Sequence, residues 1–153
     1  LREEKGYTYG ARTGFSGSLN PGTFVASSSV QSPATLESVQ IFRDLMLKYR
    51  KGIDPEDMKF TKDALVKSNA RNFETLGSLL GILNNIARYN RPDDYIKQRE
   101  EFVKNLTLEK HKELAQKYIN PDRMIYLVVG DGATQMKPLE KLGLGKPVLL
   151  ERQ

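Results

Sequence analysis

Two side chains near the start of the chain, Arg2 and Tyr9, are of the types that bind a carbonyl oxygen. A guanidinium group and a phenol both donate hydrogen bonds, either to a carbonyl or to the oxyanion that forms when a nucleophile attacks it. The same residue types also suit an Arg at the surface and a Tyr that faces a core. Their spacing does not by itself decide between these two interpretations.

The three charged residues that follow Arg2 offer less chemistry. Glu3 and Glu4 are adjacent, so in a strand or loop their side chains point apart. That arrangement is unfavourable for catalysis by a pair of carboxylates. We therefore interpret Glu3, Glu4 and Lys5 as solvated spacers.

Residue types that commonly bind metals or nucleotides are scarce. The 153 residues include no Cys and a single histidine, His111. The absence of Cys excludes disulfides, thiolate catalysis and Cys-based zinc sites, and the residues near His111 lack the spacing of metal ligands. Gly130-Asp131-Gly132 follows an apolar run but lacks the Lys and Ser/Thr of a phosphate-binding loop. Neither a metal site nor a nucleotide site is supported within this chain.

The balance of charge is basic but dispersed. Lys and Arg number 24 against 19 Asp and Glu, for a formal net charge of +5. Basic residues stand close to acidic ones along the chain, which is typical of solvated helix faces rather than of a nucleic-acid interface. No stretch of about 18 apolar residues is present, so we predict neither nucleic-acid binding nor a membrane span.

The first thirty residues predict a β-hairpin. Apolar and polar residues alternate over 7–17 and again over 23–31, and Asn20-Pro21-Gly22 between them is typical of a turn. Strict alternation would place Tyr7, Tyr9, Ala11, Thr13 and Phe15 on one face.

After the hairpin the apolar period becomes helical. Start and stop signals predict five helices, near 32–49, 54–71, 73–89, 92–105 and from Thr107 to a stop at Asn120-Pro121. Of these, 73–89 is the most apolar and is expected to be central. A continuous apolar run near 123–130 predicts a strand buried on both faces, and a weaker helical pattern covers 136–142. This order predicts a single α+β domain over 1–153, with the helices on one face of a small, mostly antiparallel sheet.

The order of several motifs resembles one known family. REEKGYTY at 2–9 resembles the R-x-x-x-G-x-x-Y stretch in the second half of the insulinase/pitrilysin-like zinc metallopeptidases, the inverzincins, which include the mitochondrial processing peptidase. Further on, DPED at 54–57, LTLE at 106–109 and VVGD at 128–131 stand where these proteins have similar short motifs. The resemblance extends over nearly the whole chain.

This resemblance implies a function and a site. Members of the family are built as two homologous lobes that close on an extended peptide, and the first lobe holds zinc through a His-x-x-Glu-His motif. The second lobe supplies an Arg and a Tyr to the scissile carbonyl, which are Arg2 and Tyr9 here. The resemblance suggests export or the bacterial periplasm as the compartment.

The chain departs from the family pattern at the metal. It contains no His-x-x-Glu-His, so zinc would be held by a homologous lobe in the same chain or in a partner subunit. We therefore expect an N-terminally truncated second-half lobe of a zinc metalloendopeptidase, inactive alone. The alternative is a scaffold or peptide-binding member of the family that lacks protease activity.

Overall fold

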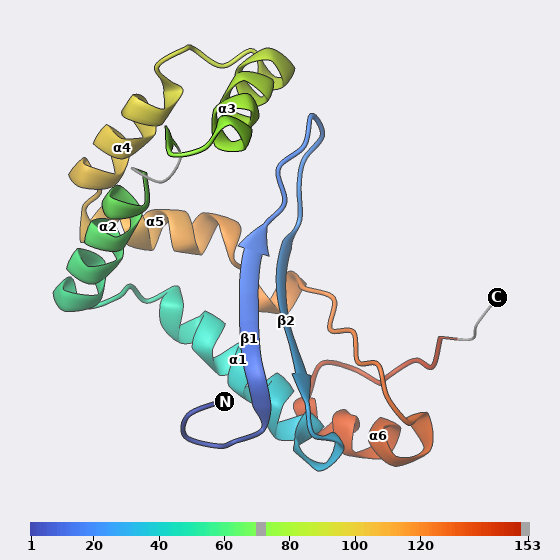
Figure 1. Ribbon diagram of the computed structural model, residues 1–153. Helices are drawn as coiled ribbons and strands as arrows, with labels where there is room; N and C mark the ends of the chain where they lie inside the picture. The colour runs from blue at the N-terminus through green and yellow to red at the C-terminus, as the bar shows by residue number, and fades with distance from the viewer. Residues whose placement is uncertain (70–72, 151–153) are drawn as a thin grey trace. The chain divides into compact units, whose positions relative to one another are not determined.

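The computed structural model describes residues 1–69 and 73–150, and within them the chain is an α+β protein (Figure 1). It begins with an antiparallel hairpin and continues through six α-helices in the described part, which confirms the predicted class and the N-terminal hairpin. The chain forms two compact units. Unit 1 comprises Leu1–Arg50 and the segment from Lys117 onward, and unit 2 comprises Lys51–Gln116.

The hairpin of unit 1 pairs β1 (Thr8–Phe15) with β2 (Phe24–Val30). The Phe15 and Phe24 rings lie opposite each other with centroids 4.9 Å apart. The connecting loop requires glycine at position 22, because a Cβ there would lie 1.6 Å from the Ser16 carbonyl oxygen. The predicted turn is therefore set by local sterics.

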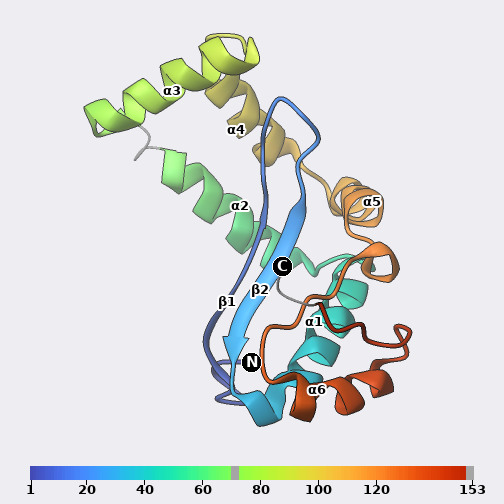
Figure 2. The same cartoon turned by 90° about the vertical axis from the view of Figure 1, so that its right-hand side faces the viewer.

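Helix α1 (Thr35–Tyr49) packs against β2 and follows a single 3-10 turn, Ser32–Ala34, where Pro33 stands near the N-terminus. Helix α6 (Gly132–Leu139) lies beside α1 (Figure 2). It starts four residues before the predicted segment because the Asp131 side chain accepts a hydrogen bond from the Ala133 amide at 3.1 Å. The side-chain amide of Gln135 on α6 donates to the Ser32 carbonyl oxygen at 3.1 Å.

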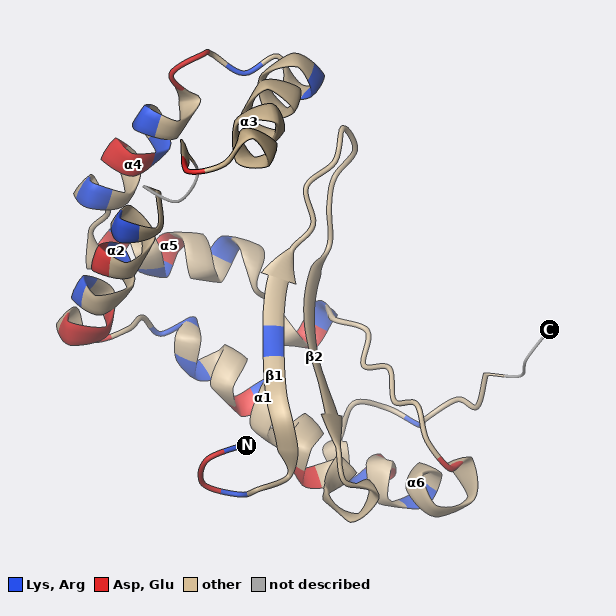
Figure 3. Cartoon of the chain, viewed as in Figure 1, with Lys and Arg blue, Asp and Glu red and all other residues tan. Residues whose placement is uncertain are grey.

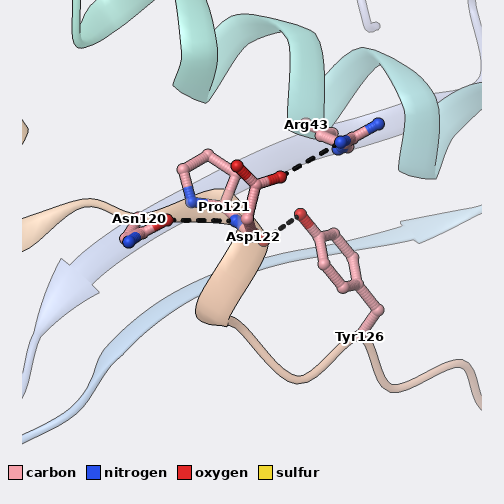
Figure 4. A network of polar contacts seen from close by, with 5 residues as sticks. All are labelled: Arg43, Asn120, Pro121, Asp122 and Tyr126. Carbon is pink, nitrogen blue, oxygen red and sulfur yellow. Dashed lines mark hydrogen bonds and ion pairs between the residues drawn. The ribbon is translucent and has the colours of Figure 1, made fainter. Parts of the chain in front are cut away.

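A polar network fixes α1 to the turn that follows α5 (Leu108–Tyr118) (Figure 4). The Arg43 guanidinium bonds the Asp122 carboxylate at 3.1 Å, and the Tyr126 hydroxyl donates to the Pro121 carbonyl oxygen at 2.8 Å. Pro121 is fully buried. Polar side chains from distant parts of the sequence therefore hold this turn in place.

The predicted buried strand near 123–130 is wrong in two respects. Residues 125–129 have no regular secondary structure, and no strand pairs with them in the described part of the chain. Ile125, Leu127 and Val129 are 95%, 70% and 92% exposed, whereas the alternate residues between them are partly covered. A continuous apolar run predicts burial on both faces only if strands flank it, and the described residues supply none.

Unit 2 is built around α2 (Pro55–Asn69) and α4 (Tyr95–Asn105), which pack against each other. The Asp54 carboxylate caps α2 by accepting from the Asp57 amide at 2.8 Å, as predicted for a helix that begins at this point. The side-chain amide of Asn69 donates to the carboxylate of Glu100 on α4 at 3.1 Å. The predicted end of this helix at Arg71 lies outside the described residues.

Helix α3 (Leu76–Tyr89) differs from its prediction. It was expected to be central, yet none of its residues is buried, and Leu76, Leu80 and Leu83 are 85%, 58% and 62% exposed. The Thr75 side chain caps its N-terminus by accepting from the Ser78 amide at 3.1 Å, so the start of the helix is locally determined. The apolar periodicity predicted that the helix has an apolar face, but it did not determine whether another element covers that face.

Charged side chains of both signs are distributed along the helices. Figure 3 shows both signs interspersed along α2 and α4, while the hairpin and α3 carry few charged residues. Among the described residues, no helix is both long enough and apolar enough to cross a membrane.

Candidate functional site

The segment that carries Arg2 and Tyr9 begins as a closed loop. The Gly6 amide donates to the Arg2 carbonyl oxygen at 3.0 Å, and the Tyr7 amide donates to the Leu1 carbonyl oxygen at 3.1 Å. Gly6 has φ +62°, which glycine adopts without the steric cost that a side chain would bring. Two backbone hydrogen bonds and one left-handed glycine therefore shape residues 1–7.

This loop is joined to the hairpin at Gln31. The Gln31 amide N–H donates to the Tyr7 carbonyl oxygen at 3.0 Å, and its side-chain amide donates to the Gly6 carbonyl oxygen at 3.4 Å. The contact continues the pairing of the two strands beyond Thr8 and Val30. The loop is thus an extension of the hairpin.

A carboxylate on α1 binds the same segment. The Tyr7 hydroxyl donates to one oxygen of Glu37 at 2.6 Å, and the Lys5 ammonium lies 3.0 Å from the other. Lys5 is therefore an ion-pair partner of Glu37, and its interpretation as a solvated spacer was wrong. Glu37 was not identified from the sequence, although an acidic residue in the first turn of a helix is the signal that could have found it.

The three groups change one another's protonation equilibria. The hydrogen bond from Tyr7, followed by that from Lys5, holds the pKa of Glu37 below its usual value. The hydrogen bond between Lys5 and Glu37 raises the pKa of Lys5. The separate hydrogen bond from Tyr7 to Glu37 raises the pKa of Tyr7. At neutral pH the cluster therefore holds an ionised carboxylate, an ammonium group and a neutral phenol.

Strand β1 contains a bulge at Tyr9. Thr8 pairs with Val30 and Ala11 pairs with Ser28, so Tyr9 and Gly10 together stand opposite the single residue Ser29. Such a bulge redirects side chains and breaks the alternation of faces. The prediction that Tyr9 shares a face with Ala11 was therefore wrong.

Hydroxyl groups stabilise this bulge. The Thr8 hydroxyl donates to the Ser29 carbonyl oxygen at 2.7 Å, and the Gly10 amide donates to the Thr8 oxygen at 3.1 Å. The Ser28 hydroxyl reaches the Thr8 oxygen at 2.8 Å and the Gly10 carbonyl oxygen at 3.0 Å. The small residues of β2 are thus used to hold an irregular stretch of β1.

Tyr9 and Arg2 are both accessible. Tyr9 is 98% exposed, and the Arg2 side chain is 67% exposed, with its Nε 3.5 Å from a Glu3 oxygen. No contact in the described part of the chain joins Arg2 to Tyr9. The structure therefore places two hydrogen-bond donors at the surface of one anchored segment.

The residues present do not suit a zinc ion. His111 is the only histidine of the whole chain, and Cys is absent. Among residues 1–69 and 73–150, no group of three or more His, Asp or Glu side chains could hold a metal.

Comparison with known proteins is informative at the level of the fold. No protein-family model and no curated protein matches the chain. The crystal structure of the peptidase M16 inactive domain from Pseudomonas fluorescens is similar, with a TM-score of 0.73 and 24% sequence identity. The chain has a peptidase M16-like fold.

The match covers 80% of this chain and 29% of that chain. The matched part of the present chain therefore spans less than a third of the length of that structure. At this level of identity the likeness shows the fold, and the function has to be argued from the site.

Proposed function

We propose that the chain is the non-zinc lobe of a zinc-dependent metalloendopeptidase of the insulinase/pitrilysin type. The peptidase M16-like fold carries this proposal, since the structural neighbour is itself named an inactive domain. In this proposal the zinc ion and its ligands belong to a homologous lobe, either in the same chain or in a partner subunit. The chain alone would not hydrolyse peptides.

Within that lobe, Arg2 and Tyr9 would contact the carbonyl of the scissile peptide bond. Both are exposed hydrogen-bond donors on a segment whose backbone is anchored at Gln31. Donors that are already in position lower the free energy of an oxyanion more than that of the ground-state carbonyl. Their contribution is to orient an extended peptide and to stabilise the negative charge that develops on it.

The test is an assay of peptide hydrolysis by the chain together with its zinc-bearing lobe. Arg2→Ala and Tyr9→Phe are each expected to lower kcat by about 10²- to 10³-fold with little change in KM, because each removes one donor to the oxyanion. Arg12→Ala is the matched control, since Arg12 is an exposed Arg on the same hairpin. It should leave kcat unchanged.

A scaffold or peptide-binding role is the second candidate. It requires no oxyanion donors, so it predicts that Arg2→Ala and Tyr9→Phe leave turnover unchanged. Equal turnover by the wild-type protein and both variants would replace the proposed function with this one.

A further inference from the structure

Glu37 on α1 binds the loop that carries Arg2. Among the described residues, its carboxylate contacts two groups of that loop. Its two carboxylate oxygens bind different partners, the Tyr7 hydroxyl at 2.6 Å and the Lys5 ammonium at 3.0 Å. A charge-assisted hydrogen bond of 2.6 Å between a hydroxyl and a carboxylate is among the stronger contacts that a side chain makes. Glu37 therefore links helix and loop at two points.

These two contacts lie between the candidate oxyanion donors in the sequence. Lys5 and Tyr7 follow Arg2 and precede Tyr9. Tyr7 is also bound through its backbone, because its amide closes the loop at Leu1 and its carbonyl oxygen accepts from Gln31. A displacement of Tyr7 would therefore be transmitted to both ends of the segment.

The opposite end of the segment is fixed by other means. The bulge at Tyr9 is held by the hydroxyl groups of Thr8 and Ser28. These hydroxyl groups do not attach the segment to α1. Glu37 supplies the side-chain contacts between the loop and that helix.

We propose that Glu37 is a positioning residue that holds the Lys5–Tyr7 segment on α1 and thereby places Arg2 and Tyr9 for contact with the scissile carbonyl. This inference rests on the proposed function of Arg2 and Tyr9. Glu37 itself does not touch the substrate in this scheme. It acts through the loop, as a group that sets the geometry in which two donors converge.

The experiment compares Glu37→Gln with Glu56→Gln in the peptide-hydrolysis assay with the zinc-bearing lobe present. Both residues are acidic and lie in the first turn of a helix, but Glu56 is exposed and has no hydrogen bond or ion pair among the described contacts. Glu37→Gln should lower kcat by about 10- to 100-fold at unchanged KM, because the donors are displaced and peptide binding is retained. Glu56→Gln should leave both constants unchanged.

Two further measurements separate positioning from a general loss of structure. Amide hydrogen exchange at Tyr7 and Gln31 should become faster in Glu37→Gln, while exchange in unit 2 stays the same. In the Arg2→Ala/Tyr9→Phe background, Glu37→Gln should cause no additional fall in kcat, because the residues through which it acts are already gone.

The outcomes distinguish the two proposals. If Arg2→Ala and Tyr9→Phe lower kcat and Glu37→Gln does not, the positioning role is wrong and the proposed function stands. A full multiplicative loss in the triple variant would also overturn it, since Glu37 would then act independently of the donors. If Arg2→Ala and Tyr9→Phe leave turnover unchanged, the proposed function fails and the positioning role fails with it.

Discussion

Each of the two units is stabilised internally by a different kind of contact. In unit 1, side chains bind across long stretches of sequence, as with Arg43 and Asp122 at 3.1 Å and Gln135 and Ser32 at 3.1 Å. In unit 2, helices α2 and α4 pack along each other and are supplemented by a few polar contacts, and α2 contains the buried Met58. Directional hydrogen bonds define exact positions, whereas helix packing mainly requires that apolar surface be covered.

This difference explains where the candidate site lies. The loop with Arg2 and the bulge with Tyr9 belong to the unit in which polar side chains anchor the backbone. Sites that align a reacting group need such anchoring, because a small displacement of that group lowers the reaction rate. The unit built on helix packing carries instead an uncovered apolar helix, α3.

The largest expected effect is on a buried side chain of unit 2. Met58 is 7% exposed, so Met58→Ala should lower the free energy of unfolding by about 2–5 kcal/mol through lost burial and an unfilled cavity. Urea denaturation followed by circular dichroism measures the change. A loss below about 0.5 kcal/mol would contradict the description of unit 2 as held together by apolar packing.

In unit 1 the corresponding change removes a hydrogen bond. Tyr126→Phe deletes the hydroxyl that donates to the Pro121 carbonyl oxygen, and should cost about 1 kcal/mol in the free energy of unfolding. Tyr9→Phe is the matched control, because Tyr9 is 98% exposed and its loss of a hydroxyl should not change stability. Equal effects of the two variants would show that the contact at Pro121 is not stabilising.

The two units should also respond differently to mild acid. Burial lowers the pKa of His111 in unit 2, so between its folded value and the ordinary value of 6.5 the unfolded chain binds more protons than the folded one. Stability should therefore fall as the pH is lowered through 6.5. Chemical denaturation at pH 7.5 and pH 5.5 should show this loss, and His111→Gln should reduce it.

Acidification of unit 1 should act at lower pH. The depressed pKa of Glu37 gives a stabilisation that is present above the ordinary carboxyl value of 4.5 and is lost as the pH falls through the folded value. The exchange rate of the Gln31 amide should consequently be constant between pH 7 and 5.5, after correction for intrinsic exchange. A rise within that window would place the responsible titration on another group.

The smallest effect is expected on α3. Leu83 is 62% exposed, so Leu83→Gln should change the free energy of unfolding by less than about 0.5 kcal/mol, since Leu and Gln have similar helix propensities. The same denaturation experiment applies. A loss as large as that of Met58→Ala would show that the apolar face of α3 is covered in solution.

Features that depend on neighbouring residues were predictable. The hairpin follows from alternation around Asn20-Pro21-Gly22, and the start of α2 follows from the Asp54 cap. The cap at Thr107 is likewise local, as its hydroxyl accepts from the Lys110 amide at 3.1 Å. In each case the residues that determine the structure lie within a few positions of one another.

The failures involve partners that are distant in sequence. Residues 124–129 have the composition of a buried strand, but burial requires flanking strands. Lys5 was interpreted as a spacer because its partner Glu37 is thirty-two positions away (37 − 5 = 32). Arg2 and Tyr9 could be selected through their family resemblance, but their role stays a prediction.

The amino-acid sequence by itself determined where the hairpin turns, where a capped helix such as α2 begins, and which side chains could donate to a carbonyl. It did so because turn formation, capping and apolar period depend on short-range sterics and hydrogen bonds. Only the tertiary structure decided that Tyr9 lies in a bulge, that Glu37 binds the loop of Arg2, and that α3 is exposed. Those outcomes depend on which surfaces meet, and the free energy of a contact is defined only when both partners are in place.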